Sequence, residues 1–241
     1  MAAQTNGRIV GAGPTDNPSS SIGVVRWLAT GAVDSKFGMD GIATLAVIPV
    51  EKVRLALAPD GKFVIVANRQ VNSTNYNILF WRCLTGGTLD EDFGTAVQIL
   101  IQPPAGKSEL ARCILVQTDG KIVVGGGSND AFFVMRLSVT GSPDPTFGSN
   151  GALRSGTVNQ QTRITAPAQQ TDDLIVGCGW QKDGTVTRNS FLLRLLPLGA
   201  GDPTFGTQSI RLLIAEGELN ALSLRGDEAI VAAGAYQKAM H

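Results

Sequence analysis

The chain has 241 residues, among them 29 glycines and 11 prolines, and its 20 basic side chains are balanced by 20 acidic ones. A net charge of zero argues against nucleic acid or an anionic membrane surface as the partner, because both attract proteins mainly through clustered positive charge. No apolar run reaches the ~18 residues that a membrane span needs, and a hydrophobic content of 43% is enough for a packed core.

The counts of cysteine and histidine exclude several kinds of catalytic site. Three cysteines, at 83, 113 and 178, cannot form a complete set of disulfides, and each lies in an apolar segment where a free thiol is expected to be buried. The only histidine is the last residue, His241. A Ser-His-Asp triad, a Cys-His dyad and a zinc site with several histidines are therefore not expected.

Short β-branched segments that alternate in polarity follow one another along the chain, which predicts strands. A tight-turn signal of the type Asp-Gly-Lys stands before an apolar segment in five places, and Asp-Gly is typical of a hairpin turn with positive φ. The five places are Asn6-Gly7-Arg8, Asp60-Gly61-Lys62, Asp119-Gly120-Lys121, Asp172-Asp173 and Gly226-Asp227-Glu228, the last two in degraded form.

A second motif, Arg-x4-Gly-x2-Asp-x2-Phe-Gly, occurs four times with its internal spacing kept. Its phenylalanines follow one another at intervals of 56, 54 and 58 residues. The four copies are Arg26–Gly31–Asp34–Phe37–Gly38, Arg82–Gly87–Asp90–Phe93–Gly94, Arg136–Gly141–Asp144–Phe147–Gly148 and Arg194–Gly199–Asp202–Phe205–Gly206. A residue that recurs in every copy is expected to do the same structural work each time, so we interpret the Arg, Asp and Phe as architecture.

The third repeat shows how the two motifs divide a unit of about 55 residues into four strands. We predict strand A at 111–117, strand B at 121–127, strand C at 131–138 and strand D near 151–157. Four antiparallel strands per repeat describe a β-propeller blade. The prediction is an all-β protein, a single β-propeller domain over residues 1–241, with four full repeats plus a terminal A–B hairpin at 219–235, hence four to five blades.

The terminal hairpin leaves three arrangements open. Residues 219–224 could take the place of the shortened first strand A and close the ring. The hairpin could instead pair with a second copy of the chain, since an unpaired strand edge is a template for association. A third arrangement is membership in a longer array of repeats.

Together, the two motifs resemble the delta-60 repeat, an uncharacterised bacterial β-propeller family, over about residues 7–234. The resemblance implies a propeller, often within large secreted or surface proteins, and no established activity. It supplies no catalytic residue. Residues 1–15 lack the pattern of a secretory signal, so the compartment stays open.

Functional residues are expected on the face formed by the B–C and D–A loops, because the A–B and C–D turns carry the repeated motifs and the B–C loops differ between blades. Trp180, which opens the long loop to Asn189, is a candidate contact residue. The strands A are expected to begin at this face. Near those starts lie Glu51, Glu109 and Glu218, with Arg54, Arg112, Arg163 and Asn220 close by.

These residues support several hypotheses. The first is a non-catalytic binding or scaffold module that takes a small molecule or a protein at the loop face, without a cofactor. The second is a metal-assisted hydrolase, similar in plan to propeller lactonases and esterases, in which Glu51, Glu109 and Glu218 hold Ca²⁺. In the third, glutamates and arginines neutralise one another in a structural array or assembly element.

Overall fold

The computed structural model describes residues 1–15, 21–47, 49–73, 75–95, 98–104, 108–127, 131–155, 161–182, 188–207, 209–214 and 216–236. In these residues all regular structure is β-strand. None of the described segments is therefore a helix that could cross a membrane.

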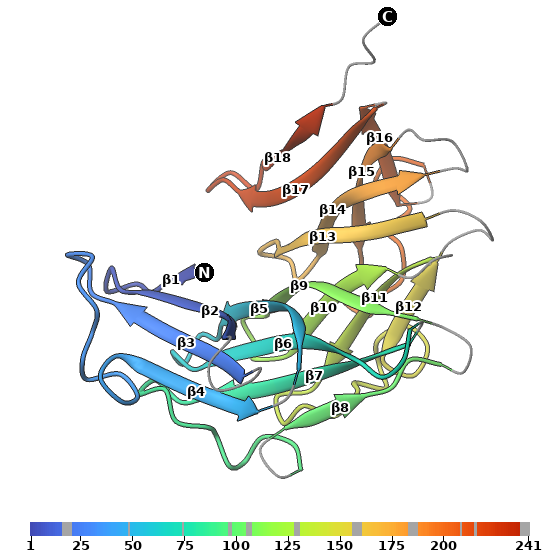
Figure 1. Ribbon diagram of the computed structural model, residues 1–241. Coiled ribbons are helices and arrows are strands. Elements are labelled where there is room, and N and C mark those ends of the chain that lie inside the picture. The colour runs from blue at the N-terminus through green and yellow to red at the C-terminus, as the bar shows by residue number, and fades with distance from the viewer. Residues whose placement is uncertain are drawn as a thin grey trace, which may run out of the picture. The chain divides into compact units, whose positions relative to one another are not determined.

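The strands form four sheets of four strands and a final hairpin, and strands that follow one another in the chain are neighbours in the sheet (Figure 1). The first two sheets contain β1 (Ala2–Ala3), β2 (Ile9–Thr15), β3 (Ser21–Trp27) and β4 (Ile42–Val47), then β5 (Glu51–Leu57), β6 (Phe63–Gln70), β7 (Tyr76–Cys83) and β8 (Ile99–Ile101). The next two contain β9 (Leu110–Val116), β10 (Ile122–Gly127), β11 (Phe132–Leu137) and β12 (Ala152–Ser155), then β13 (Gln161–Gln169), β14 (Ile175–Lys182), β15 (Asn189–Leu195) and β16 (Ile210–Ile214). The hairpin consists of β17 (Gly217–Leu224) and β18 (Ile230–Tyr236).

This arrangement confirms the all-β class and the β-propeller blades, with four repeats and a terminal hairpin. The observed strands of the third blade begin and end within one or two residues of the predicted ones. Gly120 at the A–B turn has a φ of 82°, the positive value that the Asp-Gly signal predicts. Strand A of the first blade is reduced to the two residues of β1.

The chain divides into two compact units, Met1–Ile122 with Ser138–Ser142 and Val123–Leu137 with Pro143–His241. The core of the first unit contains fully buried aromatic rings, and Phe37 and Phe63 lie 5.9 Å apart between ring centroids. In the second unit the rings of Phe132 and Phe191 are 6.2 Å apart, and Cys178, Leu192 and Leu219 form a buried cluster.

The Arg, Asp and Phe of the second motif contact one another in the same way in all four repeats, and we call this group the clamp. In each copy the arginine Nε donates to the aspartate Oδ2 at 2.7–2.9 Å. The guanidinium lies over the phenylalanine ring at 4.6–4.7 Å from its centroid. The ion pair and the cation–π contact thus fix the C–D turn to strand C.

Three of the clamps also hold the C–D turn of the following blade. In the first clamp, Arg26 Nη1 donates to the Thr85 carbonyl and the Gly38 N–H donates to the Gly86 carbonyl at 2.9 Å. Gly87, with a φ of 96°, lies so close to the Phe37 ring that a Cβ there would be 2.8 Å from it. The second and third clamps repeat these contacts on the turns that contain Gly141 and Gly199.

The electrostatics of the clamp favour ionised aspartate. Burial by itself would raise the pKa of Asp90, but hydrogen bonds from Lys62 at 2.9 Å and Arg82 at 2.7 Å outweigh it and hold that pKa below its ordinary value. The same balance, burial against hydrogen bonds and a guanidinium, lowers the pKa of Asp34. These aspartates stabilise the fold while they carry charge.

Candidate binding site

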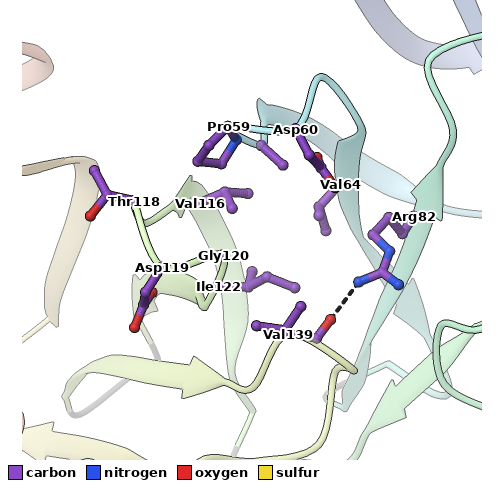
Figure 2. A pocket seen from close by; sticks show the side chains of 11 residues that line it. Pro59, Asp60, Val64, Arg82, Val116, Thr118, Asp119, Gly120, Ile122 and Val139 are labelled. Carbon is purple, nitrogen blue, oxygen red and sulfur yellow. Dashed lines mark hydrogen bonds between the residues drawn. The ribbon is translucent and has the colours of Figure 1, made fainter.

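A cavity of about 240 Å³ lies in the first unit between the A–B turns of the second and third blades (Figure 2). Val64, Val116 and Ile122 point into it, and Arg82 donates to the Val139 carbonyl at one side. The rim aspartates, Asp60 and Asp119, already accept hydrogen bonds from backbone N–H groups of their own turns at 3.0 Å. The cavity is smaller than an ordinary ligand pocket, and its polar groups serve the repeated turns.

The predicted site residues of the first unit differ in their surroundings. Glu51 is exposed, whereas Glu109 is 3% exposed. Arg54 Nε donates to the Arg112 carbonyl at 2.9 Å, and Arg54 Nη1 donates to the Val53 carbonyl at 3.0 Å. Arg54 thereby ties strand A of the second blade to strand A of the third.

The predicted residues of the second unit come together around one tryptophan. Trp180, near the end of β14, is 5% exposed. The Arg163 guanidinium lies over its ring at 4.9 Å from the centroid, and the Arg188 guanidinium lies over it at 4.3 Å. Arg188 also forms an ion pair with Glu218, whose other carboxylate oxygen accepts a hydrogen bond from Asn220 at 3.2 Å. We call these five residues the Trp180 cluster.

The cluster lies at the end of the blade where strand A starts, strand B ends and strand C starts. Arg163 is the third residue of β13, Arg188 immediately precedes β15, and Glu218 and Asn220 are near the start of β17. This is the loop face on which the sequence predicts function. The adjoining loop residues 156–160 and 183–187, which include half of the predicted B–C loop, lie outside the described residues.

Charge in the Trp180 cluster is not balanced. Burial, together with the like charge of Arg188, lowers the pKa of Arg163. Glu218 supplies one carboxylate for the two guanidiniums, and it pairs with Arg188. The buried Nε of Arg163 has no hydrogen-bond partner among the described residues. A buried donor of this kind costs about 1–3 kcal/mol unless an acceptor reaches it, so an acceptor beside the Arg163 Nε would be stabilising.

The position that Trp180 occupies serves a different purpose in the second blade. There the equivalent residue at the same distance after the turn is Asn68, which is fully buried. Asn68 exchanges two hydrogen bonds with the backbone of Ala111, at 2.9 and 2.8 Å. The second blade thus uses this position to join two blades, whereas the fourth blade places an indole and two cations there.

Sequence reasoning identified four of the five cluster residues and missed Arg188. The signal for it was present, because Arg188 is the one arginine in the loop that Trp180 opens. It was missed because the sequence of this B–C loop is not repeated in the other blades.

Among the described residues, no three His, Cys, Asp or Glu side chains gather in a way that would hold a metal ion. Glu51 and Glu109 belong to the first unit and Glu218 to the second. The calcium site on these three glutamates, and with it the hydrolase, stays a prediction without a structural observation in its favour.

One comparison with known proteins, the match to a family model, supports the fold. The family described as "Domain of unknown function (DUF5122) beta-propeller" matches residues 117–147, which confirms the predicted β-propeller repeat. No curated protein sequence matches the chain. Among solved structures, the chain is similar to MPT-4, a mannose phosphorylase from Leishmania mexicana in complex with phosphate ion, at 12% identity and a TM-score of 0.44, covering 95% of this chain and 76% of that one.

Proposed function

We propose that this β-propeller is a non-catalytic binding module and that the Trp180 cluster is its recognition site for an anionic group, a carboxylate or a phosphate, on a small molecule or a protein. The observation that carries the proposal is the placement of two guanidiniums over one buried indole, with a single carboxylate, Glu218, paired with Arg188. Arginine suits this role because its planar donors match both anions in a bidentate geometry.

The exposure of the cluster residues fits a site that is preformed and open. The Trp180 ring is buried and forms the inner side of the proposed site, whereas the Arg188 side chain is 49% exposed and can turn toward a ligand. Glu218, at 25% exposure, orients Arg188 in the absence of ligand. An incoming anion would compensate Arg163 and relieve its repulsion with Arg188, which is a gain that a neutral ligand cannot provide.

The proposal is tested by titration with simple anions under constant ionic strength. Inorganic phosphate and citrate serve as probes, and sodium chloride at equal ionic strength is the control for screening. Binding is followed by tryptophan fluorescence, since an anion that draws either guanidinium away from the indole changes its environment. We expect a saturable change in the wild-type chain and its loss in Trp180→Phe.

Charge-matched variants separate recognition from general electrostatics. Arg163→Gln and Arg188→Gln should each weaken binding at least about tenfold, as expected when one charged hydrogen bond is lost. Arg225→Gln removes the same charge from the same unit at the far end of β17, where Arg225 pairs with Asp227 at 3.0 Å, and should bind like wild type. Equal affinities in Arg188→Gln, Arg225→Gln and wild type would refute the proposal.

A further inference from the structure

The fourth clamp differs from the other three because no turn of a following blade contacts it among the described residues. Arg194 keeps its ion pair with Asp202 at 2.7 Å and its place over the Phe205 ring at 4.7 Å. Among the described residues, however, no backbone carbonyl accepts from the Arg194 guanidinium, and the Gly206 N–H donates to no carbonyl. In the first three clamps both of these donors hold the turn of the next blade.

The burial of the side chains reports the same difference. Phe37, Phe93 and Phe147 are each 0% exposed, whereas Phe205 is only partly buried. The Arg194 side chain is 22% exposed, compared with 4–10% for the other three arginines. The fourth clamp is thus fully formed within its own blade but uncovered.

A hollow and a free strand edge accompany the uncovered clamp in the second unit. The hollow has a volume of about 720 Å³ and is lined by Gln181, Thr204, Gly206, Thr207, Ile210 and Arg211. β17 packs on β14, and Thr165 Oγ1 donates to the Leu219 carbonyl at 2.5 Å, so the hairpin occupies the place of strands A and B of a next blade. Within the described residues β18 pairs only with β17, and Val231 and Tyr236 on it are 50% and 61% exposed.

We propose that the fourth clamp, the hollow beside it and the outer edge of β18 form one docking surface, and that its occupant is the outer half of a propeller blade. The occupant is a β-strand followed by a turn with glycine at the position of Gly141. The strand adds to β18 through main-chain hydrogen bonds. The turn carbonyls accept from Arg194 and Gly206, and its glycine lies on the Phe205 ring.

The three internal blade contacts specify this occupant. Each pairs a clamp with a turn that carries glycine at one fixed place, and the glycine is required because a side chain there would collide with the phenylalanine ring. The same rule applies to the fourth clamp, whose groups are chemically identical. A helix, a nucleic acid or a turn without this glycine would not satisfy both donors and the ring together.

A peptide from the chain itself is the direct probe. A fluorescently labelled synthetic peptide with the sequence of residues 131–155 contains β11, the turn with Gly141 and β12. We expect saturable binding to the full chain by fluorescence anisotropy. The matched control peptide carries Gly141→Val and should bind at least about tenfold more weakly, because the added side chain is forced against Phe205.

Variants of the chain assign the binding to the fourth clamp. Arg194→Met should weaken peptide binding about tenfold, and Phe205→Ala is a second variant that acts on the ring instead of the donors. Neither residue belongs to the Trp180 cluster, so anion binding there should be unchanged. Arg225→Met, which removes the same charge from an exposed turn, should bind the peptide like wild type.

The mass in solution is measured with and without peptide, against 25.2 kDa for one chain. A monomer that binds the peptide supports the proposal. A dimer that the peptide converts to monomers supports it too, with a second copy as the donor of the blade half. Equal binding of the wild-type and Gly141→Val peptides, absence of peptide binding, or a dimer that the peptide leaves intact overturns it.

Discussion

Replacing the clamp phenylalanine by alanine in the third and fourth repeats gives a matched pair of perturbations in one unit. Phe147 is 0% exposed, and its ring centroid lies 4.6 Å from the Arg136 guanidinium. The ring also packs against Gly199, where an added Cβ would be 2.9 Å from it. Removing a fully buried ring of this kind costs about 3–5 kcal/mol of unfolding free energy. Phe205 is partly exposed and supports no turn within the described residues, so we expect Phe205→Ala to cost roughly 1–2 kcal/mol.

The two variants are compared by urea unfolding, followed by circular dichroism and read from midpoints at constant m-value. In a thermal melt, a chain of this size loses about 2–4 °C per kcal/mol. The Phe147 variant should therefore melt roughly 6–20 °C below wild type and the Phe205 variant clearly less. Losses that agree within about 0.5 kcal/mol would refute the reasoning, because the neighbouring turn would then add nothing to the value of the ring.

Further expectations concern pH, thiol reactivity, backbone packing and metal. The pKa of Asp90 is lowered in the folded state, so the ionised side chain stabilises the fold fully above its unfolded pKa of ~4. This stabilisation is lost as the pH falls through the folded-state pKa. Asp90→Asn should therefore reduce the loss of unfolding free energy at acidic pH. Burial, with the nearby Asp90 charge, raises the pKa of Cys83 to about 12, so this thiol should react with a disulfide reagent at pH 8 only after unfolding, and fast labelling of the folded chain would contradict its burial. Gly179→Ala should destabilise the fold strongly, because a Cβ would overlap the Arg163 carbonyl, whereas Gly13→Ala, with nothing within 4 Å, should be neutral by urea unfolding. Adding 1 mM CaCl₂ instead of EDTA should leave the melting temperature unchanged, because no group of metal-ligating side chains is found among the described residues; a rise of several degrees would instead support the three-glutamate site.

The architecture was predictable because the same sequence pattern occurs several times in the chain. The Asp-Gly turns and the alternation of apolar residues mark each strand, and the fixed spacing from Arg to Phe shows that the four clamps are equivalent. The predicted boundaries in the third blade needed no knowledge of contacts between blades. A strand or turn signal is weak at one position, but the same signal repeated at a fixed spacing identifies the blade.

For the candidate site, most of the residues could be predicted from the sequence, but their burial and contacts could not. Glu51 and Glu109 lie near the start of strand A in two repeats, nine and ten residues before the aspartate of the A–B turn, yet one is exposed and the other buried. A register shift between Glu51 and Arg54 in β5, with Lys52 at a φ of 53°, accompanies the exposed position of Glu51. Such a local bulge follows from packing and has no mark in the sequence. The contact of Arg188 with Trp180 could likewise not be predicted, because the sequence that separates the two residues is not repeated in the other blades.

The clamps have a consequence for how a chain of this type can change its length. The first three clamps recognise the following turn through backbone carbonyls and one glycine, so the other side chains of that turn are free to vary. A duplicated or deleted repeat would therefore meet a compatible neighbour on both sides without any compensating substitution. The number of blades can change by whole repeats in a single genetic event, while loop residues such as Trp180 diverge independently in each copy.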